Sequence, residues 1–135
     1  LTELISQYPD LSIAIGHFGM VTRDGWTEQI KLAKNKNVRI ESGGIIWLFN
    51  EEFYPYPSAV RAIKEAADIC GYDKIMWGSD YPRTMVEITY KMSFDFVLKT
   101  DELSDSQKNA FLYENANTFY GFKGLKECEK IKHML

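Results

Sequence analysis

Three short segments with the residue pattern of strands divide the chain, and stretches with helical spacing of apolar residues lie between them. The segments at 11–16 and 74–78 are mainly apolar, while 38–42 is Val-Arg-Ile-Glu-Ser, and all three predict strands because each is bounded by glycine, proline or polar turn residues. Apolar positions repeating every three or four residues predict helices at 2–8, 26–35, 59–70, 86–99 and 105–113. The order of these elements alternates helix and strand, which is typical of a parallel α/β sheet built from right-handed βα units.

Capping residues mark several of the predicted helix ends. Asp24 is expected to cap the helix at 26–35, and Ser58 is expected to cap the helix at 59–70, with Gly71 ending it. Ser104 and Gln107 have the spacing of a capping box, in which each side chain bonds the backbone N–H of the other. Residues 45–57 are rich in aromatic side chains and are expected to form a long loop.

Two side chains that can carry out chemistry follow predicted strands directly. His17 comes after the run at 11–16, and Asp80 comes after the run at 74–78. The carboxyl ends of parallel strands are where ligands and catalytic groups lie in α/β proteins, so these residues are expected to share a site. The alternatives are a loop histidine with satisfied hydrogen bonds and an aspartate that caps a turn.

Three motifs in this order resemble a known family. They are His17-Phe-Gly19, Gly78-Ser-Asp-Tyr-Pro82 and Asn115-Ala-Asn-Thr-Phe-Tyr-Gly121, and together they are similar to the last part of the amidohydrolase-related (amidohydrolase 2) metal-dependent hydrolases. That group includes aminocarboxymuconate-semialdehyde decarboxylase and related lactonases. The resemblance implies that the chain is the C-terminal part of a TIM-type (β/α)8 barrel, holding about strands 6 to 8 and their helices. Residues 1–135 are then one partial domain, with 123–135 as a surface helix or tail.

The resemblance also implies roles for the strand-end residues. His17 corresponds to a histidine beside the metal that acts as general acid and base, a task suited to a pKa near neutrality. Asp80 corresponds to a metal ligand that takes part in the proton transfer, with Zn²⁺ as the expected ion. The family draws further ligands from a His-x-His motif, and this sequence contains none. We therefore expect the chain by itself to bind metal weakly and to be inactive.

Three further residues are candidates for contacting a small-molecule substrate. Glu41 ends the second predicted strand, where the alternative is an ion pair at the other end of the barrel. Arg83 follows Asp80 closely and could bind a substrate carboxylate with two hydrogen bonds, or it could be a solvated loop arginine. Trp47 belongs to the aromatic loop, which either packs over the barrel and a helix, shapes the substrate pocket or forms an oligomer contact. Asn115 is expected to tie the C-terminal helix down rather than to act in chemistry.

The composition of the chain bears on which partners it can bind. A net charge of −3, with no basic patch, gives no support to nucleic-acid binding, and no apolar run is long enough to cross a bilayer. Two cysteines outside any Cys-x-x-Cys pair fit a reducing cytoplasm. Three strands cannot close a barrel, so open sheet edges and the side chains of Ile13, Ile15 and Ile75 predict a homo-oligomer.

Two classes of function follow from these observations. The first is an enzyme that hydrolyses a small amide or lactone, or decarboxylates a small acid, with His17, Asp80 and a divalent metal. The second is a non-catalytic α/β binding or oligomerisation module derived from such a barrel. A fold alone does not decide between them, because barrels host many reactions.

Overall fold

The computed structural model describes residues 1–125. In this part of the chain, three strands form one sheet and six α-helices pack around it. Their bounds are α1 (Thr2–Gln7), β1 (Ile13–Ile15), α2 (Trp26–Leu32), β2 (Val38–Glu41), α3 (Pro57–Cys70), β3 (Ile75–Met76), α4 (Met92–Lys99), α5 (Asp105–Asn109) and α6 (Asn115–Tyr120). Short helical turns lie between them at η1 (His17–Gly19), η2 (Ile45–Phe49), η3 (Tyr72–Lys74), η4 (Arg83–Val86) and η5 (Ala110–Glu114).

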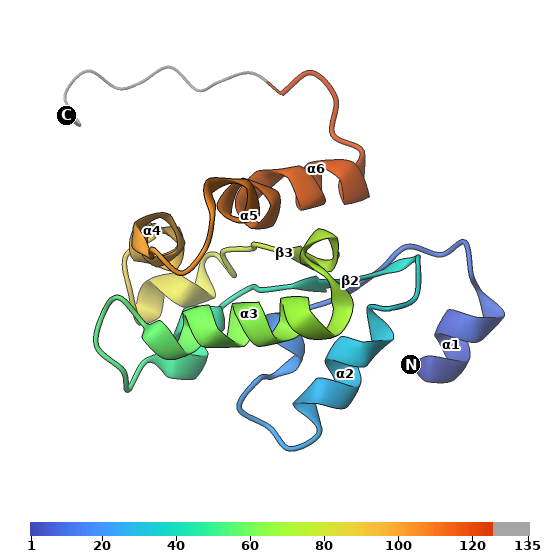
Figure 1. Ribbon diagram of the computed structural model, residues 1–135, viewed down its shortest axis with the longest axis horizontal. Helices are drawn as coiled ribbons and strands as arrows, with labels where there is room; N and C mark the ends of the chain where they lie inside the picture. Colours follow the sequence, from blue (N-terminus) through green and yellow to red (C-terminus); the bar gives the residue numbers. More distant parts are fainter. Residues whose placement is uncertain (126–135) are drawn as a thin grey trace.

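The strands form one parallel sheet in the order β1-β2-β3 (Figure 1). Ile15 is paired with Ile40, and Ile40 is paired with Ile75, so the three strands end near the same level. The predicted α/β class and the parallel arrangement are therefore confirmed. The third strand is shorter than predicted, since it covers Ile75 and Met76 rather than 74–78.

Helices α2 and α3 cover one face of the sheet (Figure 1). Alternation along β2 buries Val38 and Ile40 completely, while Arg39 and Glu41 are half-buried on the other face. Val38 and Ile40 belong to the same buried cluster as the alanines of α3 and Ile63, which is also fully buried. This packing is the main core of the described residues.

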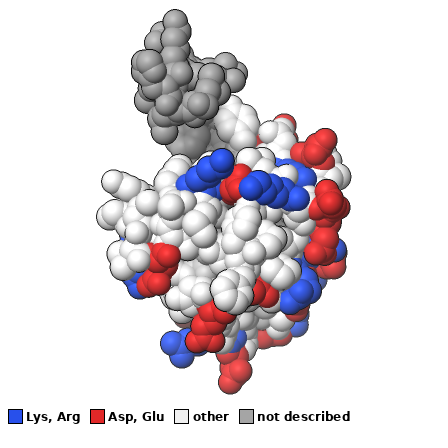
Figure 2. All heavy atoms as spheres, turned by 90° about the vertical axis from the view of Figure 1, so that its left-hand side faces the viewer, with Lys and Arg blue, Asp and Glu red and all other residues white. Residues whose placement is uncertain are grey.

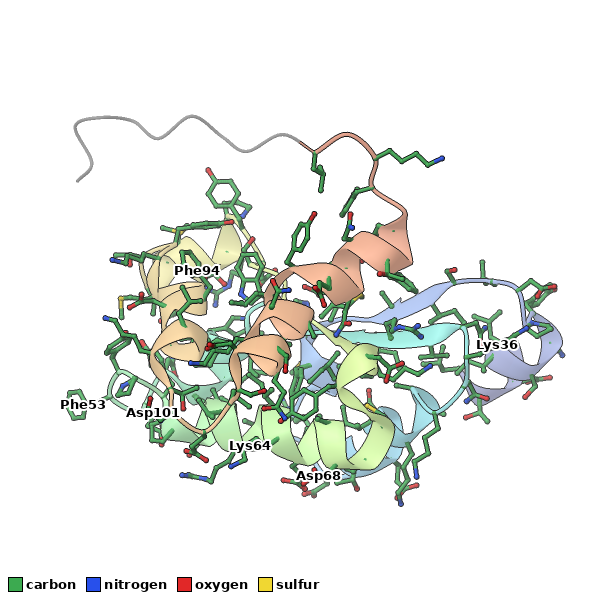
Figure 3. The ribbon with its side chains drawn as sticks, turned by 45° about the horizontal axis from the view of Figure 1, so that its top comes forward. Lys36, Phe53, Lys64, Asp68, Phe94 and Asp101 are labelled. Carbon is green, nitrogen blue, oxygen red and sulfur yellow. The ribbon has the colours of Figure 1, made fainter. Side chains whose placement is uncertain are left out.

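The expectation that three isoleucines face open space is wrong. Ile15 and Ile75 are buried in the core under the helices, and Ile13 packs against the same cluster from a half-buried position. A strand buries its alternate side chains on the face that its own crossover helix covers, so the open side of the sheet holds residues of the other parity. On the outer side of α3, Lys64 and Asp68 point away from the sheet (Figure 3).

The C-terminal helices α5 and α6 lie on the opposite side of the sheet from α3 (Figure 1). The backbone N–H of Trp77 donates to the carbonyl of Phe111 in η5 at 2.8 Å, which caps the free edge beyond β3. The Asn115 side-chain amide donates to the carbonyls of Tyr72 and Ile75 at 2.6 and 2.8 Å. Asn115 therefore ties α6 to the start of β3, as predicted.

Several predicted helix ends differ from the structure. The N-cap of α2 is Gly25 rather than Asp24, and the N-cap of α3 is Tyr56 rather than Ser58. Ser58 instead donates both its backbone N–H and its hydroxyl to the carboxylate of Glu52, at 2.9 and 2.8 Å. Both true caps have a left-handed backbone conformation, which the side-chain preferences for capping do not reveal.

The C-terminal part of the chain agrees with the prediction in one place and departs from it in two. The capping box of Ser104 and Gln107 is present at the start of α5. Helix α4 begins at Met92 rather than Val86, because residues 83–86 form the separate turn η4. Residues 123–125 are not helical, and the remainder of the predicted tail, including Cys128 and His133, lies outside the described residues.

Candidate active site

His17 stands directly beyond β1, at the start of η1. Its backbone is left-handed, with φ of 51°, so its direction is set by the glycine-flanked turn rather than by the strand. Its ring Nδ1 lies 3.1 Å from the carbonyl oxygen of Gly43. Because a carbonyl can only accept a hydrogen bond, Nδ1 carries the proton, and Nε2 of the neutral ring keeps its lone pair. This side chain can take up a proton or ligate a metal through Nε2.

Asp80 lies beyond β3, also with a left-handed backbone, at φ of 52°. Its own carbonyl accepts a hydrogen bond from the N–H of Thr84 at 3.0 Å, which joins it to η4. The side-chain Oδ2 accepts a hydrogen bond from the indole Nε1 of Trp47 at 3.2 Å. The half-buried carboxylate therefore has one oxygen engaged by a side chain, and Oδ1 has no side-chain partner among residues 1–125.

Trp47 connects the ends of the first and third strands. Its ring meets the ring of His17 edge-on, with centroids 6.0 Å apart, while its N–H bonds Asp80. The guanidinium of Arg83 lies over the same indole ring, 6.0 Å from its centroid, and is 3.5 Å from Glu87. His17, Asp80, Arg83 and Trp47 thus gather at the carboxyl end of the sheet, with β2 between the strands that carry the first two.

Glu41 ends β2, and its carboxylate occupies a space that Gly43 and Gly78 leave open. A Cβ atom at Gly78 would overlap Oε1 of Glu41, and one at Gly43 would lie 2.8 Å from Oε2. On the other side, a Cβ at Gly16 would be 3.7 Å from Oε2, which is ordinary contact. The neighbouring strand ends therefore leave room for this carboxylate because they lack side chains there.

The pKa of the Glu41 carboxyl is raised above its ordinary value, chiefly because burial disfavours the charged form. A hydrogen bond from the backbone of Gly43 and the nearby His17 oppose this shift, and the charge of Asp80 adds to it. The electrostatic coupling shows that Glu41 belongs to the same group as His17 and Asp80. Its position between them agrees with the predicted order of the strands.

A cavity of about 410 Å³ lies on the side of the sheet that faces α6. Glu41 is the charged residue of its lining, and Ala14, Gly16, Trp77 and Gly78 supply the rest of the sheet side. Apolar and aromatic residues near the C-terminus of the described chain line the other side: Leu112, Tyr113, Ala116, Tyr120, Phe122 and Leu125. His17 and Asp80 do not line this cavity, so it meets the strand-end group through Glu41.

Metal-ligand chemistry is present in part. An imidazole nitrogen and a carboxylate oxygen are donors that Zn²⁺ and related divalent ions accept. Within residues 1–125, however, no set of three or more His, Cys, Asp or Glu residues is placed to hold a metal ion. His17 and Asp80 fit such a site by donor type, and the number of protein ligands that a zinc site commonly needs is not reached by these residues.

The role of the glycine pair 43–44 was not expected from the sequence, in which the two glycines simply follow the predicted strand at 38–42. Gly43 supplies the carbonyl that holds His17, and it leaves space for Glu41. Gly44 has φ of 71° and clears the path between Trp47 and Asp80. A Gly-Gly pair after a polar strand end, between two candidate residues, was the available signal.

The charges around the molecule are mixed on the face shown in Figure 2, where basic and acidic side chains are interspersed with a larger uncharged area. Phe53, which projects from the loop before α3, is 93% exposed (Figure 3).

No helix in the described part of the chain has the length and apolar character required to span a membrane.

The chain was compared with family models, curated proteins and solved structures. The amidohydrolase (amidohydrolase 2) family model matches residues 1–122. No significant match was found among curated proteins. Among solved structures, a zinc-bound amidohydrolase from Burkholderia multivorans is similar, with a TM-score of 0.74 and 18% sequence identity over 90% of this chain and 48% of that one.

Two other solved structures carry more specific descriptions. A proposed 2-pyrone-4,6-dicarboxylic acid hydrolase from Pseudomonas putida has a TM-score of 0.68 and 24% identity, and the match covers 93% of this chain and 49% of that one. A 5-carboxyvanillate decarboxylase from Novosphingobium aromaticivorans, solved with manganese, has a TM-score of 0.59 and 19% identity over 88% of this chain and 35% of that one.

At these identities the solved structures show a shared fold, and the chain spans about half the length of the first of them or less. The family model covers 122 of the 135 residues, including both strand ends and the Asn115 motif. The chain therefore belongs to the amidohydrolase family.

Proposed function

We propose that this chain contributes His17 and Asp80 to the active site of a metal-dependent amidohydrolase-type enzyme. The observation that carries the proposal is the meeting of both side chains on one tryptophan at the carboxyl end of a parallel sheet. In this proposal the chain forms about strands 6 to 8 of a TIM-type (β/α)8 barrel, whose catalytic groups lie at that end.

The roles of the two residues follow from their contacts. Asp80 has a carboxylate oxygen available as a metal ligand, because the other oxygen is bonded to Trp47. His17 holds its Nδ1 proton on Gly43 and offers Nε2 as the group that accepts and returns a proton during the reaction. A bound divalent ion, with Zn²⁺ expected, supplies a water of lowered pKa.

Three residues are proposed to contact the substrate. Arg83 is exposed beside the site and can bind a carboxylate through its guanidinium. Glu41 presents its carboxyl group to the cavity, and the ring of Trp47 lies beside the ring of His17. We propose a small substrate with an amide, lactone or acid group.

Hydrolysis and decarboxylation both remain open as the reaction. The solved structures with a similar fold include a proposed 2-pyrone-4,6-dicarboxylic acid hydrolase and a decarboxylase with manganese, and a metal with a histidine can serve either chemistry. The remaining metal ligands have to come from outside the described residues, because those residues hold no complete metal site. We therefore propose that the isolated chain binds metal weakly and is inactive.

The deciding experiment uses the full-length enzyme that contains this chain, tested against a panel of lactones, amides and aromatic acids with Zn²⁺ or Mn²⁺. Asp80→Asn and His17→Asn are expected to lower kcat at least about 100-fold, in line with the loss of a positioned acid or base. Full activity of both variants would contradict the assignment. Binding of the same compounds without turnover would favour the alternative, a non-catalytic binding module.

Self-association is a separate part of the proposal. Strand β1 is an edge of the sheet, and exposed apolar side chains lie near both ends of the described chain, including Leu11, Phe122 and Leu125. An edge strand beside apolar surface favours pairing with another chain, so we propose a homo-oligomer of this chain. Light scattering should then show a mass above that of one chain, and a monomer at high concentration would contradict it.

A cytoplasmic location is proposed from the cysteine content alone.

A further inference from the structure

We propose that Trp47 is a positioning residue that fixes the carboxylate of Asp80 so that Oδ1 faces a bound metal. The inference deepens the proposed function and rests on Asp80 being a metal ligand. It assigns Trp47 a task distinct from substrate contact: its indole N–H holds Oδ2 and thereby selects the oxygen that remains for the ion.

The backbone at Asp80 does not by itself fix the orientation of the carboxylate. Asp80 has a left-handed backbone conformation beyond the end of β3, and rotation of a short side chain there would change which oxygen faces the site. Within residues 1–125, the indole of Trp47 is the one side-chain donor to this carboxylate, at 3.2 Å. Partners that hold a metal ligand from behind restrict its orientation and strengthen metal binding.

The glycine before η2 makes this hydrogen bond possible. A Cβ atom on Gly44 would overlap Nε1 of Trp47 and would lie 2.8 Å from Oδ2 of Asp80. Gly44 also has φ of 71°, a conformation that side chains disfavour, so two independent requirements converge on glycine at this position. The local chain is therefore built to let the indole reach the carboxylate.

The same short segment also holds the second strand-end residue. Gly43 accepts the hydrogen bond from His17 at 3.1 Å, and the Trp47 ring touches the His17 ring edge-on at 6.0 Å between centroids. The guanidinium of Arg83 lies over the indole, 6.0 Å from the ring centroid. Residues 43–47 thus set the relative positions of His17 and Asp80, which come from strands that are not adjacent.

The contact itself is tested in the chain described here. The tryptophans are labelled with ¹⁵N, and three indole N–H signals are expected, from Trp26, Trp47 and Trp77. Asp80→Ala should shift the Trp47 signal and speed its exchange with solvent. Trp26 and Trp77 donate to the carbonyls of Phe18 and Ser93 instead, so their signals serve as internal controls. An unchanged Trp47 signal would overturn the inference.

The positioning role is tested by Zn²⁺ affinity in the full-length enzyme, measured by competition with a chromophoric chelator. Trp47→Phe keeps an aromatic ring and removes the N–H, and it should weaken Zn²⁺ binding by about 10- to 100-fold. Trp47→Gln can donate again from its side-chain amide, which is not a usual zinc ligand, and it should restore part of the affinity. Tyr54→Phe removes a ring donor that bonds the carboxylate of Asp95 outside the strand-end group, and it should leave Zn²⁺ affinity within about twofold of the wild type.

The outcomes separate this inference from the proposed function. If Asp80→Ala leaves Zn²⁺ affinity unchanged, the proposed metal site itself is refuted. If Asp80→Ala abolishes binding while Trp47→Phe binds Zn²⁺ as tightly as the wild type, the metal site stands and the role of Trp47 is refuted. A loss of affinity in Trp47→Phe that Trp47→Gln does not relieve would indicate packing alone, and would also refute it.

Discussion

The core beneath α3 and the group at the strand ends use the same three strands and are built by opposite means. In the core, Ile40, Ile63 and Ile75 are fully buried, and regular strand and helix geometry holds them. At the strand ends, His17 and Asp80 have left-handed backbones, and glycines make room for polar side chains. The first region depends on the side chains that are present, whereas the second depends on the side chains that are missing.

This difference implies that stability and site geometry can be changed separately. Burial of apolar surface supplies most of the free energy of folding, so the core should carry the large stability effects. Strained backbone at functional positions persists only when surrounding structure holds it, and here the core supplies that support. Substitutions at the strand ends should therefore alter local geometry more than global stability.

The largest expected effect is in the core. Ile63→Ala in α3 removes a fully buried side chain and leaves a cavity under the sheet, and it should lower the free energy of unfolding by about 2 to 5 kcal/mol. Urea denaturation followed by tryptophan fluorescence measures the change. Leu98→Ala in α4 is the matched control, because that side chain is half exposed, and it should change stability by about 0.5 kcal/mol or less. Equal losses of stability in the two variants would show that the core under α3 does not carry the large stability effects.

A second effect concerns the link between α6 and the sheet. Asn115→Ala removes two hydrogen bonds and leaves the carbonyls of Tyr72 and Ile75 without these donors, so unfolding should become easier by about 1 to 3 kcal/mol. Asn109→Ala is the control, since exposed Asn109 bonds one exposed carboxylate, that of Glu114. Faster amide hydrogen exchange in α6 of Asn115→Ala should accompany the loss. A stability equal to that of Asn109→Ala would refute the anchoring role.

The same division explains what the sequence could predict. Apolar runs and their glycine boundaries predicted the parallel sheet and put His17 and Asp80 at one end of it, because strand periodicity and crossover rules are local and general. The anchoring role of Asn115 was also predicted. These features depend on patterns that a short window of sequence contains.

Features that depend on contacts between distant segments were not predictable in this way. Ser58 does not cap α3, because the Glu52 carboxylate takes both of its donors, and nothing in the local pattern shows that contact. The burial of Ile13, Ile15 and Ile75 was mispredicted because the parity of each strand relative to its helix is a property of the assembled sheet. The space around Glu41 depends on Gly78, which follows the neighbouring strand β3 and is distant in the sequence.

A third prediction uses that space. Gly78→Ala puts a methyl group where Oε1 of Glu41 lies, so the carboxylate should leave its position, and the overpacking should lower the free energy of unfolding by about 1 to 3 kcal/mol. Gly16→Ala is the control, because its methyl group would stand 3.7 Å from Oε2 and should be tolerated.

A double-mutant cycle isolates the cause of that loss. In a Glu41→Ala background, Gly78→Ala has no carboxylate to displace, and its effect on the free energy of unfolding should fall close to zero. An unchanged cost in that background would mean that the alanine at 78 strains the backbone, and the account of a glycine-lined space for Glu41 would be wrong.

The smallest effect is the pH dependence of stability at Glu41. Its folded pKa is raised, chiefly by burial, so the folded state binds this proton more tightly than the unfolded chain does, where the ordinary value is 4.5. The neutral carboxyl therefore favours folding below pH 4.5, and this contribution is lost as the pH rises through the raised folded value. Glu41→Gln keeps the shape without the charge, so its stability relative to the wild type should rise over that interval and then level off. Urea midpoints measured for both proteins at closely spaced pH values test this. A constant difference between them would show that Glu41 titrates alike in both states, and that the strand-end site imposes no cost on folding through this charge.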